Sequence, residues 1–436
     1  MLQINGNETI QNQLKEMLIE AYQMAKNSER HPDWIRKCQV ISDIDFLLFS
    51  ILRATIQVRS GLHFLQHLDQ VLEYRVASST WFDANESERR ARMVMAVTPF
   101  FNKLLQKEIS GRGVNHLQDF SELEDFDCVA YDGHFMKRAS HMKNAPEAKN
   151  KANAGFIFGT DLRTGFLEPV KVVSDGSKKQ SEIPFFKEFC KEQSTTSWYR
   201  KKKITVYDRA MASAAFLVDE MKKEHYLVTR YKKNSTWSKV EKLHWDESDP
   251  SNTNVLKDLL VTKKIKRRNE TLRLIVYYDV ERQKTYRFLT TLSTEIPPGL
   301  VAELYRRRWQ VEKAFDNTKN DLGETKAWGN SISSMKIQMC SVACAYNLIR
   351  SFNELNLAGN PDMVHPAQIK QEKRTDQLRN SLAKSGHKIN PLRLAGNLRR
   401  LSRNTVSSIQ NAISLKVPIR EVFRWLCREL KPRVLT

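Results

Sequence analysis

The chain has little of what secreted, membrane-spanning or zinc-binding proteins carry. Its 436 residues contain six cysteines and no Cys-x-x-Cys pair, so neither a disulfide framework nor a zinc ribbon is indicated. No apolar run approaches the roughly 18 to 20 residues that a membrane span requires. The first ten residues, MLQINGNETI, lack the apolar segment of a signal peptide. We therefore expect a soluble protein of a reducing, cytoplasmic compartment, with no membrane partner.

Acidic residues are also in deficit. The chain has 50 of them against 71 lysines and arginines, which gives a formal net charge of +21. Folding does not require such an excess, and it indicates a polyanionic partner. Because no segment suits a membrane, the sequence predicts that this partner is nucleic acid.

Residues 1–122 are predicted to form a helical N-terminal domain. The residues Asn85-Glu-Ser-Glu88 resemble a capping box at the start of the last helix, and residues 77–80 form a polar hinge. One interpretation is a helix-turn-helix-like reader of DNA, and the other is a helical cap that only packs on the next domain. The predicted helices cover residues 7–26, 41–59, 61–75 and about 85–109.

From residue 123 the periodicity changes to that of strands. A first strand over 126–132 is expected to end at Gly133, and two acids continue the apolar faces of strands, Asp132 on the first and Asp208 on the fourth. The order of three strands, helix, strand, helix and strand is the ribonuclease-H-like arrangement. In that arrangement the first and fourth strands are neighbours, which brings Asp132 and Asp208 together. The remaining elements are predicted as strands at 155–160, 167–174, 203–208 and 226–231 and helices at 182–193 and 209–224.

A β-rich insertion is predicted over about 232–296, with strands at 272–278 and 286–292. A largely apolar helix is expected over 331–355, which ends a ribonuclease-H-like domain of residues 123–355. Residues 356–436 are predicted to be a basic, helical C-terminal region. The fold class is thus α/β, a mixed sheet flanked by helices with a β-rich insertion and a helical N-terminal domain.

One further helix is predicted from Pro298 to Asp321, and it carries the most informative spacing of the chain. At about 100° per residue a set of polar side chains falls within one arc of about 60°. An apolar stripe lies beside that arc and is expected to face the core. The polar set is Tyr305, Arg308, Glu312 and Lys319, with Asp316 near the same arc; the apolar set is Leu304, Val311, Phe315 and Leu322.

The pattern Tyr, two residues, Arg, three residues, Glu, six residues, Lys resembles the signature of bacterial DDE transposases of the Insertion Sequence 4 family. The resemblance implies that Asp132, Asp208 and Glu312 are the catalytic acids and metal ligands. It implies DNA contacts from four further residues, Tyr305, Arg308, Lys319 and, beside the second acid, Arg209. Gly133 and His134, which follow the first acid, depart from the small or hydroxylic residues expected there.

The resemblance also implies cut-and-paste transposition of an insertion sequence. In this family a homodimer binds the terminal inverted repeats in a synaptic complex, nicks the ends and joins them to target DNA, in some members through a hairpin. The insertion can supply an aromatic that holds a flipped base, and Trp237, Trp245 and Trp309 are the tryptophans considered for that role.

Three carboxylates without a Cys or His cluster favour two Mg²⁺ ions, with Mn²⁺ as a substitute. Two such ions promote in-line attack of water or a 3′-hydroxyl on phosphorus. Two alternatives stay open. One is a metal-dependent, structure-specific DNA nuclease of the same fold, because hydrolysis differs from strand transfer only in the nucleophile. The other is a catalytically inactive, transposase-derived repressor, although such a relic need not keep all three acids.

Overall fold

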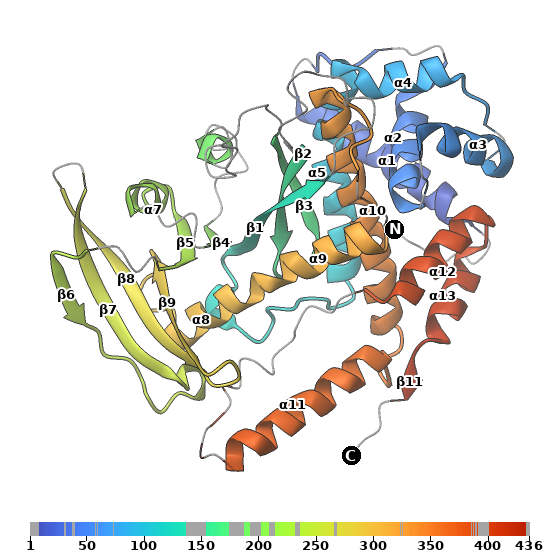
Figure 1. Cartoon of the computed structure of the whole chain (residues 1–436). Helices are drawn as coiled ribbons and strands as arrows, with labels where there is room; N and C mark the ends of the chain where they lie inside the picture. Colours follow the sequence, from blue (N-terminus) through green and yellow to red (C-terminus); the bar gives the residue numbers. More distant parts are fainter. Residues whose placement is uncertain are drawn as a thin grey trace, which may run out of the picture.

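The computed structural model shows one nine-stranded mixed sheet with helices on both faces (Figure 1). Its strand order is β3-β2-β1-β4-β5-β9-β8-β7-β6. The structure describes residues 8–29, 32–36, 40–56, 58, 60–72, 74–136, 154–173, 187–191, 202–208, 214–231, 236–265, 268–322, 324, 326–384, 386, 388, 390 and 401–432.

The first five strands follow the predicted order. The strands β1 (Asp127–Met136), β2 (Ala154–Asp161) and β3 (Leu167–Val173) form an antiparallel meander. Then β4 (Lys203–Tyr207) pairs in parallel with β1, and β5 (His225–Arg230) pairs in parallel with β4. The predicted proximity of the first and fourth strands is confirmed.

One detail of this half of the sheet differs from the sequence analysis. Strand β1 does not end at Gly133 but continues to Met136, because Gly133 pairs with Ile157 and the ladder with β2 runs on to Ala154. The two helices predicted in this half are present where the structure describes them: α7 (Ala214–Met221) lies within the predicted 209–224, and residues 187–191 are helical within the predicted 182–193.

The β-rich insertion extends the same sheet. It contributes β6 (Lys239–Lys242), β7 (Val255–Ile265), β8 (Arg268–Asp279) and β9 (Lys284–Thr290), and β9 pairs antiparallel with β5. The strands β8 and β9 were predicted, whereas β6 and β7 were missed because charged residues interrupt their apolar pattern. The insertion is thereby fixed to the strand that follows Asp208.

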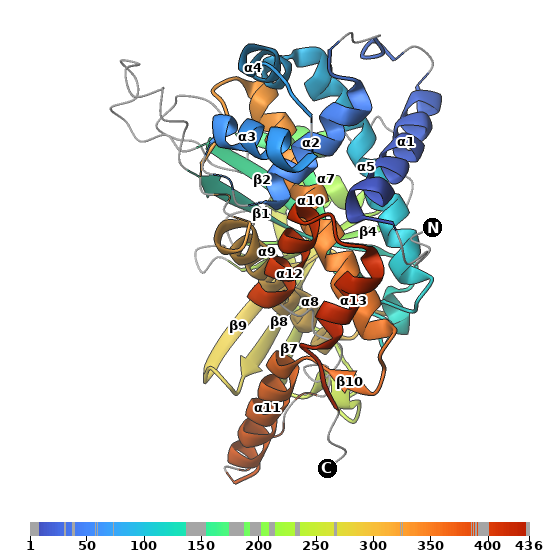
Figure 2. The same ribbon diagram turned by 90° about the vertical axis from the view of Figure 1, so that its right-hand side faces the viewer.

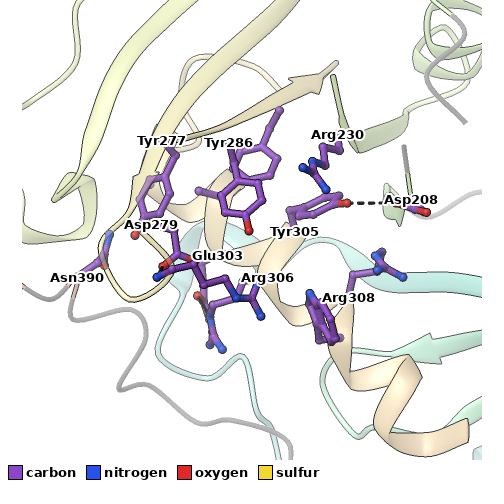
Figure 3. A pocket seen from close by; sticks show the side chains of 15 residues that line it. Asp208, Arg230, Tyr277, Asp279, Tyr286, Glu303, Tyr305, Arg306, Arg308 and Asn390 are labelled. Atoms are coloured by element: carbon purple, nitrogen blue, oxygen red, sulfur yellow. Dashed lines mark hydrogen bonds and ion pairs between the residues drawn. The ribbon is translucent and has the colours of Figure 1, made fainter. Parts of the chain in front are cut away.

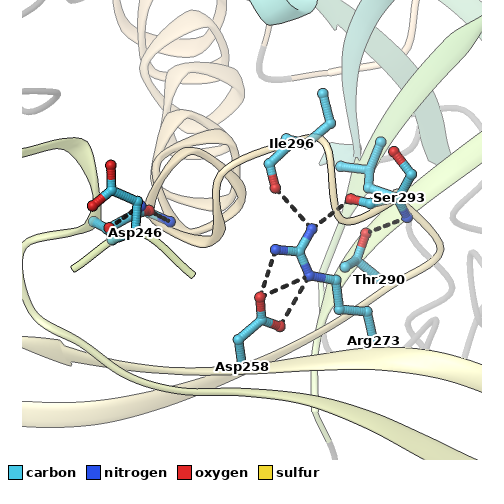
Figure 4. A network of polar contacts seen from close by, with 9 residues as sticks. Asp246, Asp258, Arg273, Thr290, Ser293 and Ile296 are labelled. Atoms are coloured by element: carbon cyan, nitrogen blue, oxygen red, sulfur yellow. Dashed lines mark hydrogen bonds and ion pairs between the residues drawn. The ribbon is translucent and has the colours of Figure 1, made fainter. Parts of the chain in front are cut away.

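A buried ion pair fastens the insertion to the segment that leads into the next helix (Figure 4). The Arg273 guanidinium on β8 binds the Asp258 carboxylate on β7 at 2.6 to 3.2 Å, and both side chains are about 2% exposed. The same guanidinium donates to the carbonyl oxygens of Ser293 and Ile296 at 2.5 and 2.8 Å. Charge, hydrogen bonds and backbone acceptors are therefore satisfied together, which a buried ion pair requires.

The predicted single helix of residues 298–321 is two helices. The first, α8, covers Pro298–Arg307 and the second, α9, covers Trp309–Asn320. At the junction the Arg308 amide donates to the Tyr305 carbonyl and the Val311 amide to the Arg308 carbonyl, at 3.2 and 3.0 Å. These are i to i+3 bonds, so the chain tightens by one 3₁₀-like turn while Arg308 keeps right-handed helical angles. The predicted apolar stripe is confirmed as buried.

The N-terminal helices and the long helix α10 cover one face of the sheet (Figures 1 and 2). Helix α10 (Ile332–Ala358) is buried along most of its length and packs against β3 and two of the N-terminal helices, α2 and α5. One apolar cluster therefore runs from the N-terminal helices to the sheet. That packing is what a helical cap would show, and DNA reading by this unit stays a prediction. The N-terminal helices are α1 (Ile10–Ser28), α2 (Asp43–Thr55), α3 (Gly61–Leu72), α4 (Ser78–Glu86) and α5 (Glu88–Ser110).

The capping box proposed for α5 is wrong by two residues. Ser87 is the N-cap, and its hydroxyl accepts from the Arg90 amide. Asn85 belongs to α4, where its buried amide donates to the Trp81 carbonyl. The hinge predicted at 77–80 is the start of that same helix. The C-terminal helices are α11 (Pro366–Lys384), α12 (Arg403–Ser414) and α13 (Ile419–Cys427).

Candidate functional site

The three predicted acids come from three elements that meet at one edge of the first half of the sheet. The register pairs Ala130 of β1 with Val206 of β4, so Asp132 and Asp208 lie at equivalent positions two residues further along. Glu312 lies in the first turn of α9, which packs against β1 and β2. Parallel pairing of β1 with β4 thus brings the two aspartates together, and α9 adds the glutamate.

Arg308 is the residue that connects these acids. Its Nη1 donates to Asp132 Oδ2 at 2.8 Å and its Nη2 to Glu312 Oε1 at 2.9 Å. The Arg308 side chain is 8% exposed, against 22% for Asp132 and 38% for Glu312. Arg308 and Glu312 are four residues apart, so the helical register predicted from the sequence is confirmed for this pair.

Burial and neighbouring charges both affect the pKa of Asp132. Burial raises the pKa of the Asp132 carboxyl above its ordinary value, and the negative charge of Asp208 adds to the rise. The Arg308 charge and a hydrogen bond from the Gly133 amide act in the opposite direction. Burial and like charge make an acid bind a cation more readily, because a cation offsets both penalties.

Asp208 is exposed and follows the last residue of β4. Its Oδ1 accepts from the Tyr305 hydroxyl at 3.4 Å, and its backbone carbonyl accepts from Thr229 Oγ1 at 3.0 Å. Burial raises the pKa of Tyr305. The tyrosine and the arginine of the sequence signature therefore contact different acids, Asp208 on one side and Asp132 with Glu312 on the other.

The donor set suits a hard divalent ion in its chemistry. It consists of carboxylate oxygens alone, and two of the carboxylates already enclose a cationic group. Within the described parts of the chain, no three His, Cys, Asp or Glu side chains are grouped closely enough to hold a metal ion. The guanidinium of Arg308 is a cation that lies between Asp132 and Glu312.

A pocket of about 110 Å³ opens beside Asp208, between α8 and the strands β8 and β9 (Figure 3). Its walls alternate aromatic rings with guanidinium groups. The Arg230 guanidinium lies 5.0 Å from the Tyr286 ring centroid, and the Arg282 guanidinium lies 5.1 Å from that of Trp309. Aromatic faces and cations together are suited to the bases and phosphates of unstacked nucleotides. The lining also includes Tyr277, Asp279, Phe288, Glu303, Tyr305, Arg306, Arg308 and Asn390.

The three tryptophans considered for base binding have different surroundings. Trp309 lines the pocket and is 44% exposed. Trp237 stacks on Tyr231 at 5.8 Å and donates to the hydroxyl of that tyrosine, as part of the core on the other face of the sheet. Trp245 is half-buried and does not line the pocket. Trp309 is therefore the one of these three that a ligand in the pocket would touch.

The other predicted residues differ in their exposure and in whether the structure describes them. Lys319 and Asp316 are exposed on α9. Arg209 lies outside the described residues. The His134 that departs from the family pattern is buried between Phe158 and Phe315, at ring-centroid distances of 6.2 and 5.0 Å. Burial lowers the pKa of His134 to about 4, and the charge of Lys319 adds to the effect, so the ring is neutral at physiological pH.

Sequence reasoning missed a buried polar network behind the site. Glu324 accepts from Gln338 Nε2 at 2.6 Å, and that amide is also 3.5 Å from the sulfur of Met136 at the end of β1. The Arg53 guanidinium of α2 lies 4.1 Å from the Trp328 ring centroid and interacts electrostatically with Glu324. The one sequence signal was a set of polar residues in apolar surroundings. Such residues are costly to bury unless they are paired.

The comparison with protein families agrees with this geometry. A model described as the transposase DDE domain matches residues 124–348, just over half of the chain. A comparison with curated proteins finds no match. The matched span begins just before β1 and ends within α10, so it includes Asp132, Asp208 and Glu312. The chain belongs to the family of transposases with a DDE domain, which are enzymes that carry out metal-dependent phosphoryl transfer on DNA.

Proposed function

We propose that this transposase mobilises an insertion sequence of the Insertion Sequence 4 type by cut-and-paste transposition. It would bind the terminal inverted repeats of its element as a homodimer, cleave the ends and join them to target DNA in a bacterial cell. The observation that carries the proposal is the arrangement of Asp132, Asp208 and Glu312 around Arg308, with Tyr305 on Asp208.

Each residue has a proposed role. Asp132, Asp208 and Glu312 would hold two Mg²⁺ or Mn²⁺ ions. When bound, such a pair activates the attacking oxygen and stabilises the leaving oxygen. Tyr305 would donate to a phosphate oxygen. Arg308 would bind phosphate through its bidentate fork and Lys319 would act as a point charge. Arg209 would add a further phosphate contact.

Three parts of the chain are assigned to these tasks. Residues 1–122 would contribute to DNA binding and residues 123–355 would carry the chemistry, with the insertion of residues 232–296 beside the reacting strand. Residues 356–436 would add a basic surface. The aromatic and arginine pocket would take an unstacked nucleotide of the transposon end, with Trp309 as the stacking surface.

The proposal is tested with Asp132→Ala and Asp208→Ala in the full chain. Both variants are expected to lose Mn²⁺-dependent cleavage of DNA that carries the element ends, while binding of that DNA persists. Cleavage at the wild-type rate by either variant would remove that acid from the site. Measured strand-transfer products distinguish a transposase from a structure-specific nuclease, because a nuclease releases cut ends and joins none. An inactive repressor would bind the ends and yield neither product.

A further inference from the structure

The side chain of Arg308 is buried, whereas a side chain that binds DNA phosphate is expected to be exposed. It is 8% exposed, and both terminal nitrogens are engaged by carboxylates at 2.8 and 2.9 Å. Its Nε is buried and has no hydrogen-bond partner among the described residues. The guanidinium is thus committed to Asp132 and Glu312, with one of its donors left unsatisfied.

The neighbouring arginine provides a contrast. Arg306 is two residues earlier and also lines the pocket, but its guanidinium binds Glu303 at 2.6 Å through two nitrogens. Glu303 is not among the proposed metal ligands. Two arginines that are two residues apart therefore differ in whether they occupy the proposed metal-binding carboxylates.

A guanidinium and a divalent ion compete for the same pair of carboxylates. A Mg²⁺ ion needs carboxylate oxygens at about 2.0 to 2.1 Å in an octahedral arrangement, and its charge repels a guanidinium bound to the same two carboxylates. The described acids are not gathered as a metal cluster, and Arg308 lies between two of them. Arg308 therefore opposes metal binding to Asp132 and Glu312 as long as its side chain stays between them.

We propose that Arg308 is a tethered competitor of the metal ions, which holds Asp132 and Glu312 in the DNA-free protein and must be released for the metal to bind. The inference rests on the proposed assignment of these acids as metal ligands. A phosphate of bound DNA is the group that can accept the released guanidinium. Because binding equilibria are reciprocal, DNA then raises the affinity for metal and metal raises the affinity for DNA.

The test is Mn²⁺ binding to the full-length, DNA-free protein, measured by electron paramagnetic resonance of the free ion. Arg308→Gln removes the charge and keeps a polar side chain of related shape, and Arg308→Ala is the second variant in case one of them fails to fold. We expect either variant to bind Mn²⁺ about tenfold more tightly than the wild type, which corresponds to about 1.4 kcal/mol. The matched control is Arg306→Gln, which removes the same charge without freeing a proposed ligand, and its affinity should stay within about twofold.

Two results would overturn the competition. One is an unchanged Mn²⁺ affinity in both Arg308 variants. The other is an equal gain in Mn²⁺ affinity in Arg306→Gln, which would mean that the change in net charge alone causes the effect. A failure of the proposed function looks different. If Asp132→Ala and Glu312→Gln leave Mn²⁺ affinity unchanged, the acids are not ligands. If they weaken it while the Arg308 variants do not strengthen it, the metal site stands and the competition fails.

A thermal measurement separates competition from loss of structure. In chelator, the Arg308 variants should melt at a lower temperature than the wild type, because two neighbouring carboxylates lose their shared cation. Added Mn²⁺ should raise the melting temperature of the variants more than that of the wild type, since it no longer has to displace a side chain. An equal Mn²⁺-induced rise in all proteins would contradict the proposal.

Discussion

Three consecutive arginines make different contacts because their surroundings differ. Arg306 pairs with Glu303 and faces the pocket. Arg307 is fully buried, where it binds Glu303 and the His116 carbonyl and lies 4.9 Å from the Phe120 ring centroid. Arg308 binds Asp132 and Glu312, two of the three candidate metal ligands. Successive residues of a helix point about 100° apart, so three adjacent arginines face the pocket, the buried interior and the candidate acids.

The first prediction concerns the acids of α9. Glu312→Gln should abolish cleavage and keep or tighten DNA binding, because it removes a proposed ligand, removes a negative charge and frees one arm of Arg308. Lys319→Ala should retain residual cleavage while end binding weakens by about 1.5 to 3 kcal/mol, the value of a lost charge-assisted contact. Cleavage and gel-shift assays on the same DNA separate the two effects.

Asp316 provides the control within the same helix. It lies one turn after Glu312 and is exposed, and Asp316→Asn should cleave DNA normally. If Asp316→Asn is inactive in a folded protein while Glu312→Gln is active, the assignment of residues on this helix is wrong and the match to the signature is a coincidence.

A second prediction compares two tryptophans. Trp309→Ala should weaken binding of end DNA by about 1 to 3 kcal/mol, the contribution of one base stacked on an aromatic side chain. It should also abolish quenching of a fluorescent base analogue placed at the transposon end. Trp237→Ala should lower thermal stability instead, because that ring packs in the core against Tyr231. Equal effects of the two substitutions on quenching would exclude the pocket as the place where the base stacks.

A third prediction concerns pH and Glu324. Burial raises the pKa of this carboxyl from 4.5 to about 7, although Gln338 and Arg53 act against the rise. The protonated form is therefore favoured in the folded state. The stability it contributes is complete below about pH 4.5 and is lost as the pH rises to about 7. The loss amounts to about 3 kcal/mol.

Glu324→Gln cannot titrate, so its melting temperature relative to the wild type should rise between pH 5 and pH 8. Glu122→Gln, a change of the same kind at an exposed position, should follow the wild type throughout. A constant difference between Glu324→Gln and the wild type across this range would mean that Glu324 titrates normally.

At the level of elements, α8 is positioned by its contact with the insertion. The Gly299 amide donates to Asn252 Oδ1 at 3.0 Å, and a Cβ on Gly299 would overlap the Ser251 carbonyl of the short 3₁₀ helix η6 (Pro250–Asn252). Asn390 donates to the same Ser251 carbonyl at 2.6 Å. The helix that carries Tyr305 and leads to Arg308 therefore begins at a point fixed by the insertion.

The fourth prediction follows from this close approach. Gly299→Ala should destabilise the protein by about 1 to 3 kcal/mol through overpacking, measured by urea unfolding. It should also reduce cleavage, since α8 must shift and Tyr305 moves with it. Gly359→Ala is the control, because its backbone has an ordinary negative φ of −74° and its added methyl group meets no atom closer than 3.3 Å. Equal stability of the two variants would show that η6 moves to accommodate the added methyl group without loss of stability.

The sequence predicted which helices and strands form more accurately than it predicted where they begin, end and connect. The strand order around Asp132 and Asp208 followed from apolar alternation, and parallel pairing of β1 with β4 is confirmed. The tightening at Arg308, the shift of the α5 cap to Ser87 and the continuation of β1 past Gly133 depend on a few local hydrogen bonds, which a helical or strand period does not encode. The position of Arg308 between two acids was also not predicted, because the family resemblance assigned Arg308 to a phosphate and to no partner within the chain.

In the whole molecule, two surfaces carry exposed basic residues. The outer strands β6, β7 and β8 carry exposed lysines and arginine, and so does α11, which extends away from the body of the molecule in both views (Figures 1 and 2). None of the described helices is long and apolar enough to cross a membrane. The exposed residues are Lys239, Lys242, Lys257, Lys264 and Arg268 on the strands and Lys370, Lys373, Arg374, Arg379 and Lys384 on α11.

The last prediction uses these two surfaces to locate the DNA. Affinity for duplex DNA should fall steeply with salt, with a slope of several units on a log-log plot, because each neutralised phosphate contributes about 0.9 through counterion release. Replacing Lys370, Lys373 and Arg374 by glutamine should reduce the slope by up to about 3 if α11 lies on the DNA. The same replacement at Lys239, Lys242 and Lys257 changes net charge equally and tests the strand surface. A loss of slope in one triple variant alone identifies the contacting surface, whereas equal small losses in both would mean that distributed charge attracts the DNA. A nearly flat salt dependence of the wild type would contradict the electrostatic account altogether, since the net charge of +21 would then serve solubility and not binding.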